Sequence, residues 1–122
     1  MNTSKLDADA MFGAAHITPR RSGLSVSIWS CHCGCVRLSA ICRTPVMEIG
    51  NFHYSVFITI EQNPVIKVKS GKINESELSK IQQGIDYVSR NYDLFLKHYY
   101  DTDYSFDDED LFNALEERGD YK

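Results

Sequence analysis

The residues best suited to chemistry stand in one short stretch, Cys31-His32-Cys33-Gly34-Cys35, which is followed by Cys42. Structural zinc is held by four nitrogen or sulfur ligands, usually from two C-x2–4-C pairs on separate turns. Here the spacing is C-x-C-x-C instead. If Gly34 marks a hairpin turn, Cys42 lies at the far end of the returning strand, about 23 Å from Cys35 at ~3.3 Å per residue. One ion therefore cannot contact both thiols.

Three interpretations of this cluster remain open. Unligated thiols in and beside a turn are the simplest, because reducing compartments rarely allow lasting disulfides. A redox-active or strained disulfide is the second, and a metal site is the third. The candidate metal ligands are Cys31, His32, Cys33 and Cys35. No cofactor is expected on the simplest interpretation.

Alternating oxygen-bearing side chains near the carboxyl end could bind calcium as an EF-hand loop does. They are Asp101, Asp103, Ser105, Asp107 and Glu109. Such a loop needs glycine at its sixth position and a bidentate glutamate at its twelfth. The chain has Phe106 and Phe112 there, so the pattern argues against calcium.

Motifs of common enzyme classes are missing from the sequence. There is no G-x-S-x-G elbow, no H-E-x-x-H pair and no G-x-x-x-x-G-K-[ST] phosphate loop. His16, His53 and His98 are isolated histidines, which more often pack or face solvent than catalyse. We therefore expect a protein that is not an enzyme and works by binding.

Charge is divided unevenly along the 122 residues. The segment 101–122 carries nine acids against two bases, whereas residues 1–100 carry eleven bases and eight acids. The net charge of −4 argues mildly against sequence-independent nucleic-acid binding by the surface as a whole. The charge division is therefore the strongest indication of a partner.

Hydrophobic periodicity predicts an α+β fold in one domain, residues 23–122, preceded by an arm at 1–22 in which a short extended piece around Met11–Thr18 is left open. Alternation over 24–30, 35–42, 52–60 and 65–69 predicts an antiparallel sheet of about four strands. Apolar residues at three- and four-residue steps predict one long helix over 75–99, with Asn74 and Glu77 as a capping box and a break near Asn91 left open. Gly84 is expected to lie off the apolar stripe of this helix.

A short acidic helix is predicted over 107–118. It is too short to persist alone in water, so its apolar residues must dock on this chain or on another molecule. The candidate residues for a partner are Asp107, Asp108, Glu109, Asp110, Leu111, Phe112 and Leu115. The helix could instead be a solvated end of the domain, or its acids could imitate a phosphate backbone.

The second hypothesis is that the strands bind nucleic acid. Basic residues come mostly from the strand half, and Trp29, His53 and Phe57 lie among them. A basic sheet face with aromatic residues could bind single-stranded nucleic acid by charge and base stacking. The candidate residues for this activity are Arg37, Lys67 and Lys69.

Two segments also carry a resemblance. The run Asn51-Phe-His-Tyr-Ser-Val-Phe-Ile-Thr-Ile60, the turn Asn63-Pro64 and the helix entry at Gly71-Lys-Ile resemble a small bacterial domain of unknown function. The ending from Phe106 to Tyr121 is similar in character to small proteins of phages and mobile elements. The resemblance implies a prokaryotic or phage setting and an accessory role, such as inhibition of a host defence enzyme of the CRISPR type.

No apolar run approaches the ~20 residues of a membrane span, and the polar start does not read as an export signal. A cytoplasmic protein that does not contact the membrane is therefore expected. Its oligomeric state is left open.

Overall fold

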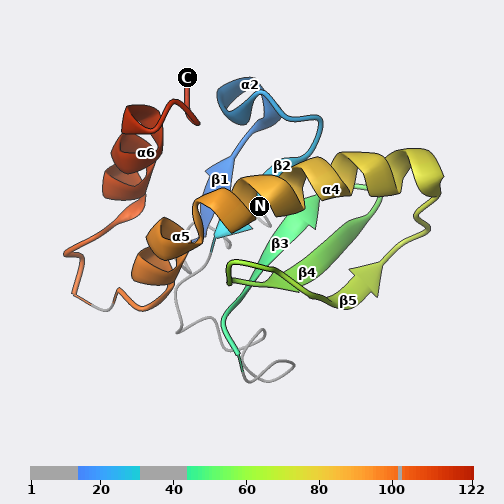
Figure 1. Cartoon of the computed structure of the whole chain (residues 1–122), viewed down its shortest axis with the longest axis horizontal. Coiled ribbons are helices and arrows are strands. Elements are labelled where there is room, and N and C mark those ends of the chain that lie inside the picture. Colours follow the sequence, from blue (N-terminus) through green and yellow to red (C-terminus); the bar gives the residue numbers. More distant parts are fainter. Residues whose placement is uncertain (1–13, 31–43, 102) are drawn as a thin grey trace, which may run out of the picture.

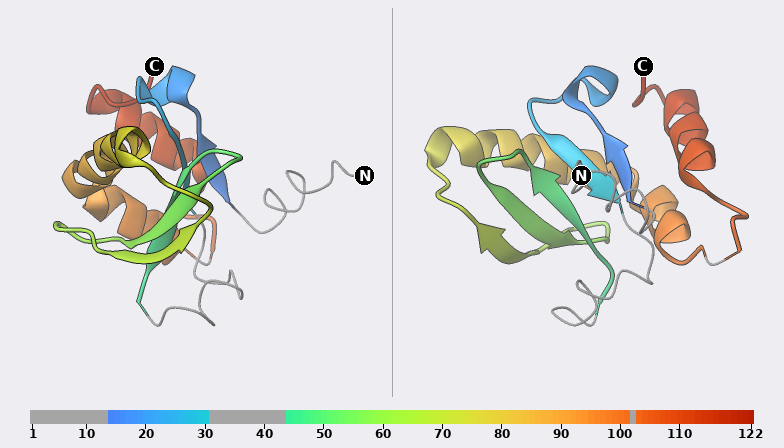
Figure 2. Two further views of the ribbon diagram at one scale, coloured as in Figure 1. Left: turned by 90° about the vertical axis from the view of Figure 1, so that its right-hand side faces the viewer. Right: turned by 180° about the vertical axis from the view of Figure 1, so that it is seen from behind.

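One antiparallel sheet with helices on one of its faces makes up the fold, as the computed structural model of residues 14–30, 44–101 and 103–122 shows (Figures 1 and 2). Its five strands follow chain order: β1 (Ala15–Ile17), β2 (Ser27–Ser30), β3 (Val46–Gly50), β4 (Ser55–Thr59) and β5 (Ile66–Ser70). The helices are α2 (Pro19–Ser22), α4 (Glu75–Arg90), α5 (Tyr92–Tyr99) and α6 (Asp108–Glu117). The predicted α+β class is confirmed.

Three of the five strands match the predicted positions: β2 and β4 are shorter than predicted, and β5 has the predicted length but begins one residue later. β3 was not predicted, because its residues are buried on both faces and show no alternation. β1 falls inside the predicted arm, where it forms the edge strand beside β2. The strand predicted over 35–42 lies outside the described residues.

The helix-facing side of the sheet forms the core. Ile28 faces Ile49 across β2 and β3, and Ile49 faces Val56 across β3 and β4. All three are fully buried. Burial of each such side chain contributes about 1.5–3 kcal/mol to folding. This row, shared by the three central strands, supports the helices above it.

The long predicted helix is interrupted at Asn91, as the open alternative allowed. Asn74 and Glu77 form the predicted capping box at the start of α4. Asn91 ends α4, and its side-chain amide donates to the Tyr87 carbonyl at 3.0 Å and to the Asp120 carboxylate at 2.8 Å. Asn91 therefore joins the end of α4 to the carboxyl-terminal segment.

Gly84 lies on the buried face of α4, which corrects the expectation that it lies off the apolar stripe. A Cβ at this position would stand 2.6 Å from Cγ2 of Ile49 and 3.3 Å from Cγ2 of Val26. Glycine is needed here because α4 approaches the sheet too closely for a larger residue. The apolar residues that flank it on this face are Ile81 and Val88.

None of the helices in the described part of the chain is long and apolar enough to span a bilayer.

Candidate functional site

The short helix α6 docks on its own chain, which corrects part of the predicted partner site. Leu111 and Leu115 are fully buried in the core. Phe112 is half-buried and stacks on Tyr121 with ring centroids 4.9 Å apart. Since the helix is amphipathic and marginal alone, the apolar stripe that suggested a partner stabilises the helix itself. The two leucines are therefore not available to another molecule in this conformation.

Three of the acids at the start of α6 have local roles. The Asp107 carboxylate accepts from the amide of Asp110 at 3.0 Å, and the Asp110 carboxylate accepts from the amide of Asp107 at 3.1 Å. The Asp108 carboxylate lies 2.7 Å from Nε2 of His98. These contacts cap and anchor the helix, so Asp107 and Asp108 stabilise α6 as well as being candidates for partner contact.

Ser30, His98 and Asp108 form a hydrogen-bonded chain that the sequence did not reveal. Oγ of Ser30 lies 2.8 Å from Nδ1 of His98. With Asp108 on Nε2, a neutral ring would carry its hydrogen on Nε2 and accept the serine hydroxyl at Nδ1. The three residues come from β2, α5 and α6, and the 68-residue separation between serine and histidine hid them.

This arrangement has the residue types of a nucleophile, a base and an orienting acid. A nucleophile must reach its substrate, however, and both Ser30 and His98 are fully buried. In this conformation the hydrogen bonds among the three residues satisfy buried polar groups and join β2, α5 and α6. These bonds explain why so short a helix is held in a fixed place.

Ion pairs at the carboxyl-terminal end use acids outside the exposed face of α6. Arg118 forms a bidentate pair with Asp93, which lowers the pKa of that carboxyl. Arg90 pairs with Asp120 at 3.1 Å. Burial acts to raise the pKa of Asp120, but hydrogen bonds from Arg90 and Asn91 outweigh it, and the pKa is lowered.

The exposed acids of this end, including Asp110 of the helix cap, form what we call the acidic surface. They are all exposed and have no ion pair with a described residue: Asp103, Glu109, Asp110, Glu116 and Glu117. Two exposed tyrosines accompany them, Tyr100 at 60% and Tyr104 at 81% of their full accessibility. Tyrosines among charges are typical of binding surfaces.

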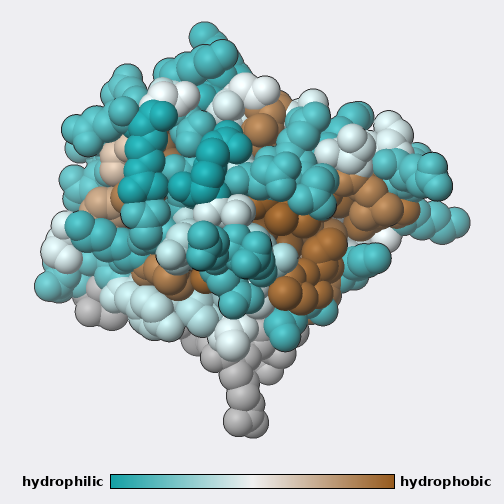
Figure 3. Space-filling view, in the orientation of Figure 1, coloured by the Kyte–Doolittle hydropathy of each residue, from teal (hydrophilic) through white to brown (hydrophobic). Residues whose placement is uncertain are grey.

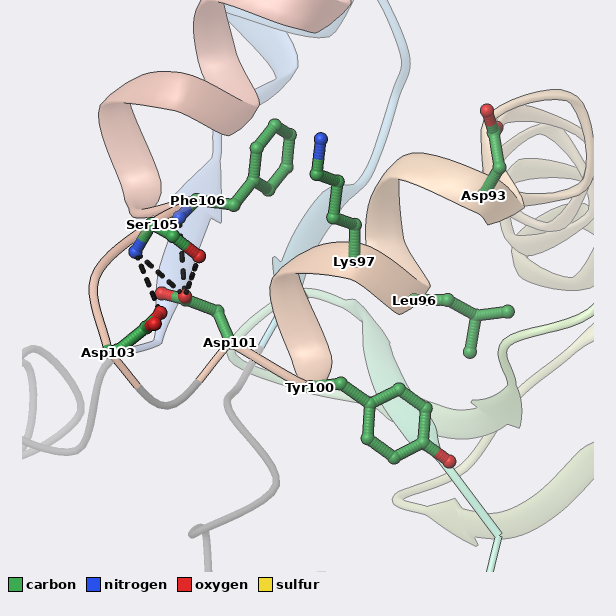
Figure 4. A pocket seen from close by; sticks show the side chains of 8 residues that line it. All are labelled: Asp93, Leu96, Lys97, Tyr100, Asp101, Asp103, Ser105 and Phe106. Carbon is green, nitrogen blue, oxygen red and sulfur yellow. Dashed lines mark hydrogen bonds between the residues drawn. The ribbon is translucent and has the colours of Figure 1, made fainter.

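An open depression of about 570 Å³ lies between α5 and the loop that leads to α6 (Figure 4). One carboxylate oxygen of Asp101 accepts from the amide and hydroxyl of Ser105 and from the amide of Phe106, at 3.0 to 3.2 Å. Nζ of Lys97 stands 4.6 Å from the centre of the Phe106 ring. These contacts shape the loop and present Tyr104, which has φ of 62°.

Metal binding finds no support in the described part of the chain. No three histidine, cysteine, aspartate or glutamate side chains are grouped there so that they could hold an ion. Asp101, which the calcium interpretation used, organises its own loop. The proposed ligands Cys31, His32, Cys33 and Cys35 lie outside the described residues.

The basic strand residues stand at the other end of the molecule. Lys67 and Lys69 are exposed on β5, the sheet edge farthest from α6 (Figure 1). Arg37, the third residue of the predicted basic cluster, lies outside the described residues.

Two of the aromatic residues that were to stack on bases, Trp29 and Phe57, lie on the sheet face turned away from α4, whereas His53 lies in the turn between β3 and β4. Trp29 is stacked on His16. On the neighbouring strand β3, Glu48 lies opposite Trp29, and Phe57 of β4 lies opposite Glu48. An acid between the two aromatic residues opposes the approach of phosphates. This arrangement weakens the nucleic-acid hypothesis for the strand face.

No family model matches the chain, and neither a curated protein nor a solved structure gives a significant match.

Proposed function

We propose that this protein regulates or inhibits a protein partner by binding a basic region of it with the acidic surface. The observation that carries the proposal is that the acids of α6 stay exposed while its leucines are buried. Lys67 and Lys69 lie at the opposite end of the sheet, so they do not neutralise those acids (Figure 1). These two bases of the strand half are therefore separated from the acids of α6, whereas Arg90 and Arg118 pair with Asp120 and Asp93 at the α6 end.

The chemistry of the acidic surface favours a particular class of partner. Closely spaced carboxylates attract a basic patch over a distance and speed the encounter. Basic patches are commonest on proteins that bind nucleic acid, because phosphates demand them. We therefore propose a nucleic-acid enzyme as the partner, and the phage-like character of the ending favours a host defence enzyme.

Tyr100 and Tyr104 give this surface apolar contact area in addition to charge. Both are largely exposed, and both flank the depression or its loop. A tyrosine offers a large rigid contact at small cost in conformational entropy. They replace Leu111 and Leu115 as the proposed anchors.

A charge-reversal experiment tests the proposal without disturbing the core. The variant Glu109→Lys with Glu116→Lys changes one exposed residue at each end of α6, so the effects on the helix dipole oppose each other. The matched control is Glu75→Lys with Asp86→Lys, two exposed acids of α4. Binding partners would be captured from extracts of the native host with all three proteins.

The α6 variant should lose more than about tenfold of the captured partner, whereas the control should retain it. Duplex DNA should displace the partner from the unaltered protein. Equal capture by both variants, with unchanged thermal unfolding, would contradict the proposal. Truncation of the tail is a poor test, because it removes the buried Leu111 and Leu115.

A further inference from the structure

We propose that the outer edge of β5 binds an extended, acidic segment of a partner protein as an additional strand of the sheet. The inference concerns a second surface and does not depend on the proposed role of the acidic surface. Its evidence is the free edge, the apolar side chains beside it and the lysines along it.

The first observation is the edge itself. β5 pairs with β4 on one side, and no strand lies on its other side among the described residues. At the opposite edge β1 has only three residues and connects to α2, whose Arg21 carbonyl accepts from the Lys122 amide. An edge strand offers a row of backbone donors and acceptors to an extended peptide. Of the two edges, β5 is the longer and the more open.

Apolar side chains gather where α4 passes over β5. The space-filling view shows a hydrophobic patch right of centre, with hydrophilic residues around it (Figure 3). Exposed or half-buried apolar residues of these elements and their connections include Val65, Ile66, Ile73, Leu78 and Ile85. Val65 and Leu78 are 52% and 39% exposed. An added strand would cover the alternate side chains of such a patch.

Phe52 marks the far end of this edge. Its side chain is 99% exposed, although Asn51 fixes the turn by accepting from the amides of His53 and Tyr54. Gly71 lies directly against this turn, since a Cβ there would stand 2.4 Å from the His53 carbonyl oxygen. A fixed turn therefore presents an exposed phenyl ring beside the end of β5.

Charge indicates the kind of segment that would bind. Lys67, Lys69 and Lys72 are exposed on and just after β5. Lys69 faces Val56 and therefore shares the α4-facing side of β5 with Ile66, and Lys67 lies at a register shift. Acidic side chains of an incoming strand could pair with these lysines, and its apolar side chains could cover the neighbouring aliphatic residues. A second copy of this chain is disfavoured, because pairing of two β5 strands would bring lysines together. Single-stranded nucleic acid is disfavoured because the patch is aliphatic apart from Phe52.

The experiment uses a short blocked peptide of alternating glutamate and valine as the probe. Its affinity would be measured by fluorescence anisotropy, and the amide exchange of β5 by NMR. Controls are the same peptide with lysine in place of glutamate, and oligothymidine. The variant Lys67→Glu with Lys69→Glu is matched by Arg20→Glu with Lys97→Glu, two exposed bases away from β5.

The acidic peptide should bind, and the β5 variant should weaken it about tenfold or more while the control variant changes it less than about twofold. Bound peptide should also protect alternate amides of β5, which simple charge attraction would not do. Binding of oligothymidine in preference to the peptide would overturn the proposal in favour of nucleic acid. Absence of peptide binding, equal effects of both variants, or binding without amide protection would also overturn it.

Discussion

The two ends of this molecule expose different kinds of surface. At the α6 end the apolar side chains Leu111 and Leu115 are fully buried, and the exposed side chains are mainly acids accompanied by Tyr100 and Tyr104. At the β5 end, Val65 and Leu78 remain partly exposed beside Lys67 and Lys69. A charged surface mainly sets the rate and selectivity of an encounter, whereas apolar area beside charge adds affinity.

This difference shows that amphipathic patterns alone do not locate an interface. The stripe on α6 reads like a docking face, yet it is used to hold a marginal helix on the domain. The exposed aliphatic area lies on α4 and at the start of β5, where the sequence indicated only a basic strand. The contrast between the ends can be tested by substitutions at each of them.

The largest expected change in stability comes from replacing a leucine at the α6 end, and the matched substitution is a leucine at the β5 end. Leu115→Ala should lower the free energy of unfolding by about 2–5 kcal/mol, since it removes a fully buried side chain and leaves a cavity. Leu78→Ala, at a 39% exposed position, should cost under about 1 kcal/mol. Urea unfolding measures both. Equal losses of unfolding free energy in the two variants would show that Leu115 and Leu78 do not differ in burial as described.

A second substitution probes the helix that connects the two ends. Gly84→Ala should destabilise the protein by about 1–3 kcal/mol, because the added methyl group meets Ile49, although alanine favours helix by ~1 kcal/mol. Gln83→Ala, at the exposed neighbouring position, is the control and should be neutral or slightly stabilising. Thermal unfolding distinguishes them, and a stabilised Gly84→Ala protein would show that α4 does not approach the sheet so closely.

A third comparison concerns the anchoring of α6 through His98. Asp108→Ala removes the carboxylate from a buried ring nitrogen and should cost about 1–3 kcal/mol, whereas Asp108→Asn keeps an acceptor and should cost less. Hydrogen exchange of α6 amides should rise in the alanine variant before the strands are affected. Unchanged exchange would show that the leucines alone hold the helix.

The smallest expected effect is the loss at low pH of the stability that the Asp93–Arg118 ion pair contributes. The pKa of Asp93 is lowered in the folded state, so its contribution is present above the unfolded value of about 3.9 and is lost as pH falls through the lower folded value. Both side chains are partly exposed, at 55% and 38%, so the pair is worth only about 0.5 kcal/mol.

Arg118→Gln should therefore be less stable than the unaltered protein at pH 7, and the gap should narrow below about pH 4. Arg20→Gln, an exposed arginine of α2, should show no such pH-dependent gap. Urea unfolding at several pH values provides the measurement. A gap that stays constant down to low pH would contradict the assigned ion pair.

Local sequence patterns correctly predicted the features that depend on neighbouring residues, namely three strands and two helix starts. Alternation located β2, β4 and β5, and side-chain capping located the starts of α4 and α6 at Asn74 and Asp107. β3 was missed because both of its faces are buried, and Gly84 was misplaced because its reason lies in the distance between α4 and the sheet. Such distances are set by tertiary packing and leave no period in the sequence.

The site was predicted less well than the fold for the same reason. The acids Glu109 and Asp110 are exposed as expected, but Leu111 and Leu115 are buried, and only the folded chain decides between these outcomes. The contact of Ser30 with His98 spans 68 residues, so no spacing rule could find it. Exposure and long-range contacts are properties of the fold rather than of any segment.

If the carboxyl-terminal acids form a separate surface for a basic partner, a short polylysine peptide should bind there, and an NMR titration with that peptide measures the binding directly. The amide shifts should concentrate in α6 and residues 103–107 and should weaken as salt is added. Shifts of equal size around the other exposed acids, Glu61, Glu75 and Asp86, or no shifts in α6, would contradict the account.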